Sequence, residues 1–162
     1  GITNIGTKAF CNCSGLTSIK LPGSITTIGN EAFNGCTSLT ELYINDGKKT
    51  LSLGYGNIDT NPKALFFECP LETLYLGRNL LYDKSNSPFY QISTLKTVTI
   101  SDYVTTISDY AFQGCTNLTD INIPNSVLER VVYARPYYIV EVDGEQIVVY
   151  GDVDFASCAE YM

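Results

Sequence analysis

A unit of 23 residues recurs along this chain, and this recurrence limits the fold more than any other feature of the sequence. Three segments begin with isoleucine and end in Ala-Phe: residues 5–10, 28–33 and 107–112. In each, cysteine follows the phenylalanine by three residues, and leucine follows the cysteine by three. Two less regular copies surround Phe66 and Phe89, the latter with Ile92 in the cysteine position. The phenylalanines, at 10, 33, 66, 89 and 112, are spaced by 23, 33, 23 and 23 residues, so we predict five coils with ten extra residues between the second and third.

Each unit contains one short strand. Residues 17–21 and 97–100 alternate polar and apolar side chains and are rich in β-branched residues, which favours a strand. Proline, Asn-Asp or Ser-Asp follows and ends the strand. The Ala-Phe segment is too short for an ordinary amphipathic helix and predicts a single helical or 3-10 turn. Because one coil cannot bury its own apolar side, we predict a solenoid in which stacked coils form columns of phenylalanine and leucine.

The repeat resembles a known family. Its consensus here is Ile-Gly-x-x-Ala-Phe-x-x-Cys-x-x-Leu-x-x-Ile-x-Ile-Pro-x-Ser-Val, which is similar to the BspA-like leucine-rich repeat of bacterial surface proteins. The tracts 67–80 and 43–54 resemble a variant of the same family. The resemblance covers residues 5–127. It implies a leucine-rich-repeat solenoid, with short parallel strands on one face and short helical or 3-10 turns on the other. It also implies export to the cell surface and adhesion to host or bacterial proteins, and it carries over no catalytic residue.

The repeat pattern divides the chain into two parts. We predict the solenoid at residues 1–128, with a longer insert near 45–63. Residues 137–142 and 146–150 flank Asp143-Gly144 and predict a β-hairpin. An open solenoid end needs a cap, so residues 129–162 are interpreted as a capping hairpin or as the start of a following module. The chain begins with Gly1 rather than methionine, so we expect it to be a piece of a longer protein. No apolar run reaches the length of a membrane helix.

The cysteines at the repeat position invite a metal or disulfide interpretation. They are Cys13, Cys36, Cys69 and Cys115. Structural zinc sites use close pairs that converge tetrahedrally, whereas these residues are spread along a stack. We therefore predict small buried thiols, and Ile92 in the same position supports this. Cys11 and Cys158 lie outside the column and, at opposite ends of the solenoid, are not expected to pair.

Composition argues against catalysis and against nucleic acid. The chain has no histidine to activate a serine or cysteine nucleophile. Glu41, Glu72 and Asp120 fall on the predicted strand face. This face is open to solvent, so it offers no pocket in which carboxylates could act as catalytic acid and base. With 10 basic and 17 acidic side chains the formal charge is −7, and the basic residues form no stripe for a phosphate backbone. We predict no enzyme activity, no cofactor and no metal.

The outward-pointing residues of the strands are the candidate ligand-binding site. Between the inward apolar residues, each strand presents side chains that line one continuous sheet face, and Arg78 follows the third strand. The candidates are Lys20, Glu41, Tyr43, Thr73, Tyr75, Arg78, Thr97, Thr99, Asp120 and Asn122. Exposed tyrosine beside arginine and carboxylate is typical of binding hot spots, but tyrosine on a sheet also stabilises cross-strand packing.

We therefore predict a monomeric, non-enzymatic adhesion module of a bacterial cell-surface or secreted protein. Its partner would be a host extracellular-matrix protein, another bacterial surface protein or a glycan, without nucleic acid and without membrane insertion by these residues. The alternative is a structural spacer in a larger surface protein, with no ligand of its own. A standard interface uses about 20–30 residues per partner, so this face alone would bind weakly or share the work with the loops at 45–63 and 77–88.

Overall fold

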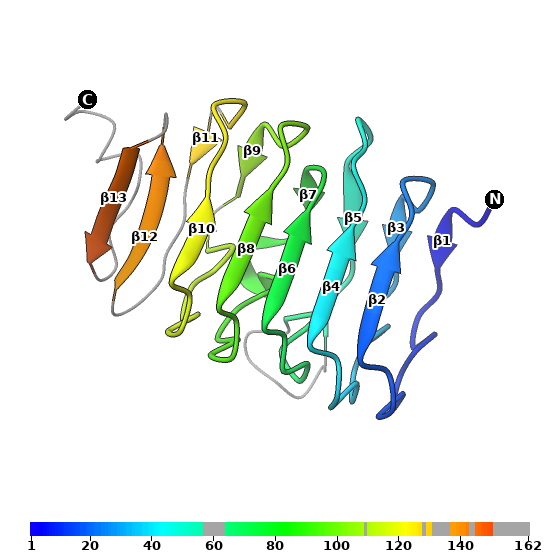
Figure 1. Cartoon of the computed structure of the whole chain (residues 1–162). Coiled ribbons are helices and arrows are strands. Elements are labelled where there is room, and N and C mark those ends of the chain that lie inside the picture. The colour runs from blue at the N-terminus through cyan, green and yellow to red at the C-terminus, as the bar shows by residue number, and fades with distance from the viewer. Residues whose placement is uncertain (57–63, 109, 128, 131–136, 143–144, 151–162) are drawn as a thin grey trace.

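The computed structural model describes residues 1–56, 64–108, 110–127, 129–130, 137–142 and 145–150. Its main element is a seven-stranded sheet in the order β13-β12-β10-β8-β6-β4-β2. One strand of this sheet follows each phenylalanine of the repeat: β2 (Ser18–Leu21), β4 (Glu41–Ile44), β6 (Thr73–Leu76), β8 (Thr97–Ile100) and β10 (Asp120–Asn122). These five strands are parallel and run side by side in Figure 1, one per coil. The predicted solenoid with parallel strands on one face is confirmed.

A second row of strands lies behind the first (Figure 1). Four of them form a parallel sheet: β1 (Asn4–Ile5), β3 (Thr27–Ile28), β5 (Leu51–Leu53) and β7 (Leu80–Leu81). Two more, β9 (Thr106–Ile107) and β11 (Glu129–Arg130), pair separately. The sequence analysis did not predict this row, because strands of two or three residues are too short to show alternation.

The insert between the second and third coils contributes to this second row. Ile28 of β3 pairs with Leu53 of β5, so these two residues are equivalent in successive coils. The step from the first row to the second takes 11 residues in the second coil, from Leu42 to Leu53, and nine in the first coil, from Ile19 to Ile28. Thirteen residues then lead from Leu53 to Phe66, where five lead from Ile28 to Phe33. The ten extra residues are thus divided into two before β5 and eight after it.

The core is a file of stacked phenylalanines. Rings of successive coils, from Phe10 to Phe112, lie 5.4, 5.2, 5.6 and 5.6 Å apart between centroids. Phe33, Phe66, Phe89 and Phe112 are fully buried, whereas Phe10 in the first coil is half-buried. Rings of this size contribute most of the apolar area buried in a core. Leucines at 39, 71, 95 and 118 form a second buried column.

The Ala-Phe segments contain hydrogen-bonded turns, and the expected helical or 3-10 turn is not confirmed there. Backbone amides alternate: the N–H groups of Lys8, Phe10 and Asn12 donate to the next coil, whereas those of residues 9, 11 and 13 donate back three residues. Lys8 and Asn12 have φ of 58° and 60°, and Gly35 and Gly114 occupy the position of Asn12 with φ of 75° and 76°. Left-handed residues on both sides of the phenylalanine prevent a regular helix. A 3-10 helix, η1 (Lys84–Asn86), lies instead ahead of Phe89.

Three cysteines of the repeat form hydrogen bonds with the neighbouring coil. Cys36, Cys69 and Cys115 are buried, as predicted, and Cys13 of the first coil is half-buried. Each buried thiol also donates to the phenylalanine carbonyl of the preceding coil, over 3.2 Å from Cys36, 3.6 Å from Cys69 and 3.2 Å from Cys115. Burial raises the pKa of Cys69 and of Cys115 to about 12. These thiols therefore remain protonated donors between coils. Cys158 lies outside the described residues.

The predicted hairpin is present and joins the main sheet. Strands β12 (Tyr137–Val142) and β13 (Glu145–Tyr150) pair antiparallel, with Val142 opposite Glu145. β12 pairs in parallel with β10, the strand of the fifth coil. The hairpin thus follows the solenoid at the edge of the same sheet, and its role as a cap stays a prediction.

Candidate binding face

Nine of the ten candidate residues lie on the outer face of the main sheet, in two rows. The strand register aligns Lys20, Tyr43, Tyr75, Thr99 and Asn122 in one row across five coils. The other row consists of Ser18, Glu41, Thr73, Thr97 and Asp120. Leu42 and Leu74, which alternate with these residues along the strands, are buried. Successive side chains of a strand thus point in turn into the core and onto the outer face.

Tyr43 and Tyr75 form the centre of this face. Their rings stack with centroids 4.1 Å apart and planes within 3° of parallel. Neighbouring strands lie about 4.8 Å apart, so the two rings stack face to face across adjacent strands of the sheet. Tyr43 remains 38% exposed. The Nζ atom of Lys20 lies 4.4 Å from the centre of the Tyr43 ring, which places a cation on one end of the stack.

The hydroxyl of Tyr75 is fixed by a turn of the preceding coil. It donates to Oδ1 of Asp46 over 2.8 Å. Burial raises the pKa of Tyr75 to about 12, Asp46 and Tyr43 act in the same direction, and a hydrogen bond with Ser101 opposes them. Tyr75 is therefore a neutral donor at physiological pH. From the sequence, Asp46 was expected only to end the strand in a turn. Its position two residues after β4 was the one indication that it could also accept a hydrogen bond from Tyr75.

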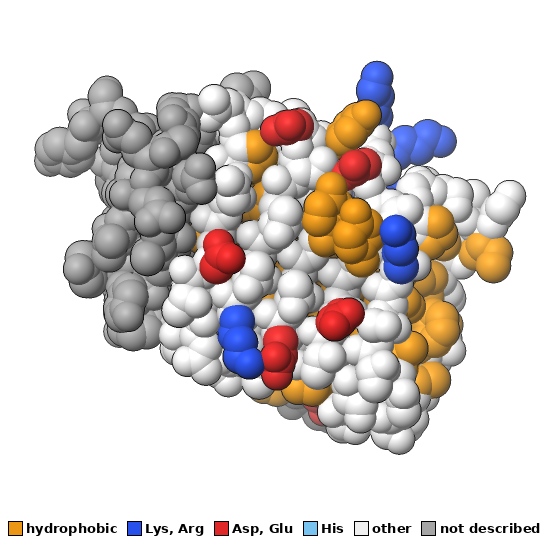
Figure 2. All heavy atoms as spheres, viewed as in Figure 1, with side chains coloured by type: hydrophobic (Ala, Val, Ile, Leu, Met, Phe, Trp, Pro, Cys, Tyr) orange, Lys and Arg blue, Asp and Glu red, His pale blue; other side chains and the backbone are white. Residues whose placement is uncertain are grey.

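A shallow depression lies between the two rows. It has a volume of about 410 Å³ and is lined by Ser18, Ile19, Lys20, Glu41, Leu42, Tyr43, Thr73 and Tyr75. Figure 2 shows this face with an orange cluster over β4 and β6, a blue side chain on its β2 side, and uncharged polar surface on its β8 side. Red side chains are scattered around the cluster.

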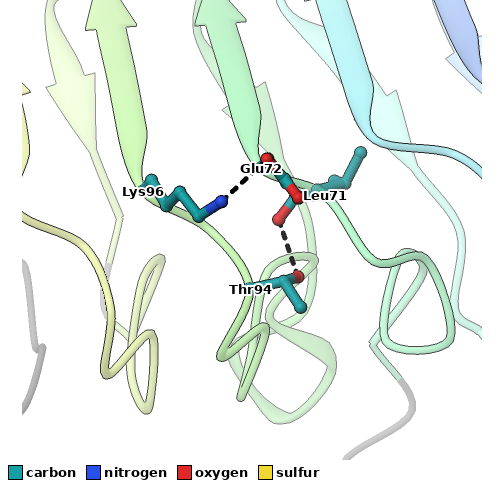
Figure 3. Close-up of polar contacts among 4 residues, drawn as sticks. All are labelled: Leu71, Glu72, Thr94 and Lys96. Atoms are coloured by element: carbon teal, nitrogen blue, oxygen red, sulfur yellow. Dashed lines mark hydrogen bonds and ion pairs between the residues drawn. The ribbon is translucent and has the colours of Figure 1, made fainter.

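Polar contacts between neighbouring coils hold the lower edge of the face. Nζ of Lys96 lies 2.9 Å from Oε2 of Glu72, and the Thr94 hydroxyl donates to the Leu71 carbonyl over 2.7 Å (Figure 3). Both side chains of the ion pair are about half exposed, at 57% and 48%, so the pair contributes little to stability. The charge of Lys96 is therefore already paired with a carboxylate of its own chain.

Arg78 does not lie on this face, and its assignment to the site is wrong. Its side chain is fully buried, and its guanidinium donates to three carbonyls of the first coil: Gly23 at 3.1 Å, Ile25 at 2.7 Å and Pro22 at 2.9 Å. The strand alternation that places residues outward ends at Leu76. Gly77 then passes directly against the Asp46 amide and the Ile44 carbonyl, where a Cβ would collide, and the next side chain is directed inward. Burial lowers the pKa of Arg78.

The chemistry of the face is that of a contact surface. In the part of the chain that the structure describes, no three His, Cys, Asp or Glu side chains converge as metal ligands would. The face combines two aromatic rings, one depression and separated charges, an arrangement that can bind another surface through apolar contact and hydrogen bonds.

Comparison with known proteins identifies the repeat. The family model described as "BspA type Leucine rich repeat region" matches residues 3–134 in six copies, one more than the five predicted. No curated protein matches the chain. A solved structure, the leucine-rich-repeat protein of T. pallidum, is 21% identical over 82% of this chain and 67% of that chain, with a TM-score of 0.46.

Proposed function

Because the chain belongs to the BspA-type leucine-rich-repeat family, we propose that it is a non-catalytic module that binds a protein partner through the outer face of its main sheet. Leucine-rich repeats are general protein-interaction scaffolds and are typically not enzymes. The finer assignment concerns the place and the residues: a face centred on Tyr43 and Tyr75, in a bacterial protein at the cell surface or secreted. In the described residues no helix is long and apolar enough to cross a membrane.

The observation that carries this proposal is the exposed tyrosine stack. Tyrosine, tryptophan and arginine supply most binding hot spots, because they offer a large rigid contact area and a polar tip. Here stacking at 4.1 Å and the Tyr75–Asp46 hydrogen bond hold both rings in place before any partner arrives. A side chain that is already fixed loses less conformational entropy on binding.

Ring orientation favours a protein over a glycan. Sugars bind aromatic side chains chiefly by lying flat on a ring face. The inner faces of Tyr43 and Tyr75 cover each other, and Lys20 lies over the remaining face of Tyr43. Three of the four ring faces are therefore covered, which leaves a sugar the outer face of Tyr75 alone, whereas the ring edges suit the mixed apolar and polar contacts of a protein interface.

The size of the face limits the affinity. Two rows of five residues are fewer than the 20–30 per partner of a standard interface. Segment 77–88 can add less surface than predicted, since Gly77, Arg78, Ser87 and Pro88 are buried. We therefore expect moderate affinity, with adjoining surfaces sharing the contact. In the alternative, a spacer without a ligand, the tyrosine stack would serve cross-strand packing alone.

Binding to purified extracellular-matrix proteins and a glycan array tests the proposal. Wild-type chain and a Tyr43→Ala/Tyr75→Ala variant are compared by surface plasmon resonance. Phe67→Ala is the matched control, because Phe67 is also 38% exposed but lies in a turn beside the buried file. We expect at least one protein ligand whose affinity falls about tenfold or more in the tyrosine variant, as for hot-spot residues, and is unchanged in the control.

Stability must be measured on the same samples. A loss of stacking and cross-strand contact costs about 1–2 kcal/mol, or roughly 2–8 °C in Tm for a chain of this length. Binding of a glycan but no protein would contradict the partner class. Absence of any ligand, or ligand binding that survives loss of both rings, would contradict the binding face and support the spacer.

A further inference from the structure

The tyrosine stack is occupied by a cation at one end and open at the other. Lys20 lies over Tyr43, whereas the residue opposite Tyr75 on its other side is Thr99, followed by Asn122 in the next strand. We propose that the outer face of Tyr75, above Thr99, is a seat for an arginine side chain of the partner protein. This inference rests on the proposed function and adds to it the chemistry of the partner.

The Lys20–Tyr43 contact shows that this ring system accepts a cation. Ammonium and guanidinium groups are attracted to the negative face of an aromatic ring within about 6 Å of its centre, and the 4.4 Å distance of Lys20 lies well inside that range. Tyr75 is parallel to Tyr43 and equivalent in register. Its hydroxyl donates to the Asp46 carboxylate, which increases electron density on the ring and strengthens attraction for a cation.

The space above Thr99 suits a flat group. Thr99 stands to Tyr75 as Tyr75 stands to Tyr43, one strand further along the sheet. Thr99 is exposed, and its short side chain covers less of the Tyr75 ring than a third ring of the ladder would. A guanidinium group is planar and stacks on aromatic faces, so it can continue the stack as a flat group at this position, whereas an ammonium group acts there as a point charge alone.

Charge on the face selects for a cation. Within two residues of the five repeat strands, the described and exposed charged residues are five carboxylates and two ammonium groups: Glu41, Asp46, Glu72, Asp102, Asp120, Lys20 and Lys96. Lys48 and Lys49 lie further out, beyond the Asp46 turn. Lys20 is already engaged over Tyr43, and Lys96 with Glu72. An arriving arginine therefore meets a surface of opposite net sign, in a chain of formal charge −7. A neutral sugar or an acidic side chain has no such attraction.

NMR with a defined peptide tests the seat directly. The chain is prepared with 13C-labelled tyrosine rings, and the Tyr75 resonances are assigned by their loss in Tyr75→Phe. The probes are acetyl-tetra-arginine amide and its neutral citrulline counterpart, titrated at physiological ionic strength. We expect saturable shifts of the Tyr75 resonances with the arginine peptide, and none with the citrulline peptide.

Two matched substitutions separate the seat from general attraction to an acidic protein. Thr99→Lys places an ammonium group beside Tyr75, as Lys20 lies over Tyr43, and should weaken binding of the arginine peptide by about threefold or more, the size of one exposed cation–π contact. Thr27→Lys adds the same charge at an exposed position of β3, on the second sheet, and should leave the affinity nearly unchanged. Equal affinity of Thr99→Lys and Thr27→Lys, or equal shifts with the citrulline peptide, would overturn the arginine seat.

The two proposals fail in different ways. If Tyr43→Ala/Tyr75→Ala abolishes binding of a protein ligand while Thr99→Lys binds that ligand normally, the face is correct and the arginine seat is wrong. If the arginine peptide shifts Tyr75 and its binding is weakened by Thr99→Lys, while the protein ligands bind the double variant normally, the seat exists and the assigned function of the face is wrong.

Discussion

Two columns of stacked aromatic rings run across the coils, one inside the solenoid and one outside. The inner file has a phenylalanine in every coil, with ring centroids 5.2–5.6 Å apart. The outer column has rings in the second and third coils alone, Tyr43 and Tyr75, at 4.1 Å, while Lys20, Thr99 and Asn122 fill the equivalent positions. Since three coils fold without an aromatic residue there, the stacking of coils does not require one. The inner column therefore builds the fold, and the absence of such a requirement outside is consistent with our proposal that the outer column binds a partner.

The largest expected effect is the loss of a ring from the middle of the inner file. Phe66 is fully buried between Phe33 and Phe89, so Phe66→Ala removes contacts on both ring faces and leaves a cavity. We expect a loss of about 3–5 kcal/mol in the free energy of unfolding, measured by urea denaturation. Phe67→Ala, next in sequence but exposed, should cost far less. Similar losses from the two variants would show that the file is not the core.

Arg78 and Tyr75 are three residues apart and lie on opposite sides of the sheet surface. Arg78→Met keeps much of the side-chain volume but leaves the buried carbonyl of Ile25 and the carbonyl of Gly23 without the Arg78 donor, whereas the Pro22 carbonyl keeps the Ile25 N–H. We expect a loss of about 1–3 kcal/mol in the free energy of unfolding, because an unpaired buried acceptor keeps its desolvation cost. Ligand affinity measured on the folded protein should not change. Weakened binding with unchanged stability would return Arg78 to the binding face.

The end of the inner file should be less sensitive than its middle. Phe10 is half-buried and stacks on one ring, Phe33, within the described structure. We expect Phe10→Ala to cost about 1–2 kcal/mol, less than half the cost of Phe66→Ala. Urea denaturation of the two variants under one set of conditions measures the ratio. A ratio near one would mean that burial at the two positions is equal in solution.

The smallest effect concerns the proton of Tyr75. Its pKa is raised to about 12 in the folded chain, against about 10 for an ordinary tyrosine. The folded state therefore holds this proton more tightly, and the associated stabilisation is complete below pH of about 10 and is lost as the pH rises through about 12. NMR titration of the labelled ring should show this pKa, and Asp46→Asn should lower it. An unchanged pKa in Asp46→Asn would exclude the carboxylate as a cause.

The inner columns and the outward rows could be predicted from the sequence. Alternation within a strand tells which side chains point inward, and the repeat aligns equivalent residues of successive coils. It was insufficient where two coils touch through their turns. The positive φ of Lys8 and Asn12 excludes a helix, and the glycines at positions 35 and 114, equivalent to Asn12, were the available signal. The inward direction of Arg78 depends on Gly77 passing against the second coil, which no periodicity reveals. The Asp46–Tyr75 hydrogen bond joins residues 29 apart in the chain, and it required the register itself.

Equilibrium unfolding of Tyr43→Ala/Tyr75→Ala beside Phe66→Ala, with circular dichroism to confirm the fold of each, is the most direct test of the separation between the two columns. Loss of both outer rings should cost about 1–2 kcal/mol, well below the single inner ring, and leave the wild-type spectrum. If the tyrosine variant is destabilised as much as Phe66→Ala or more, the outer column is part of the core, and the distinction between a column for folding and a column for recognition is wrong.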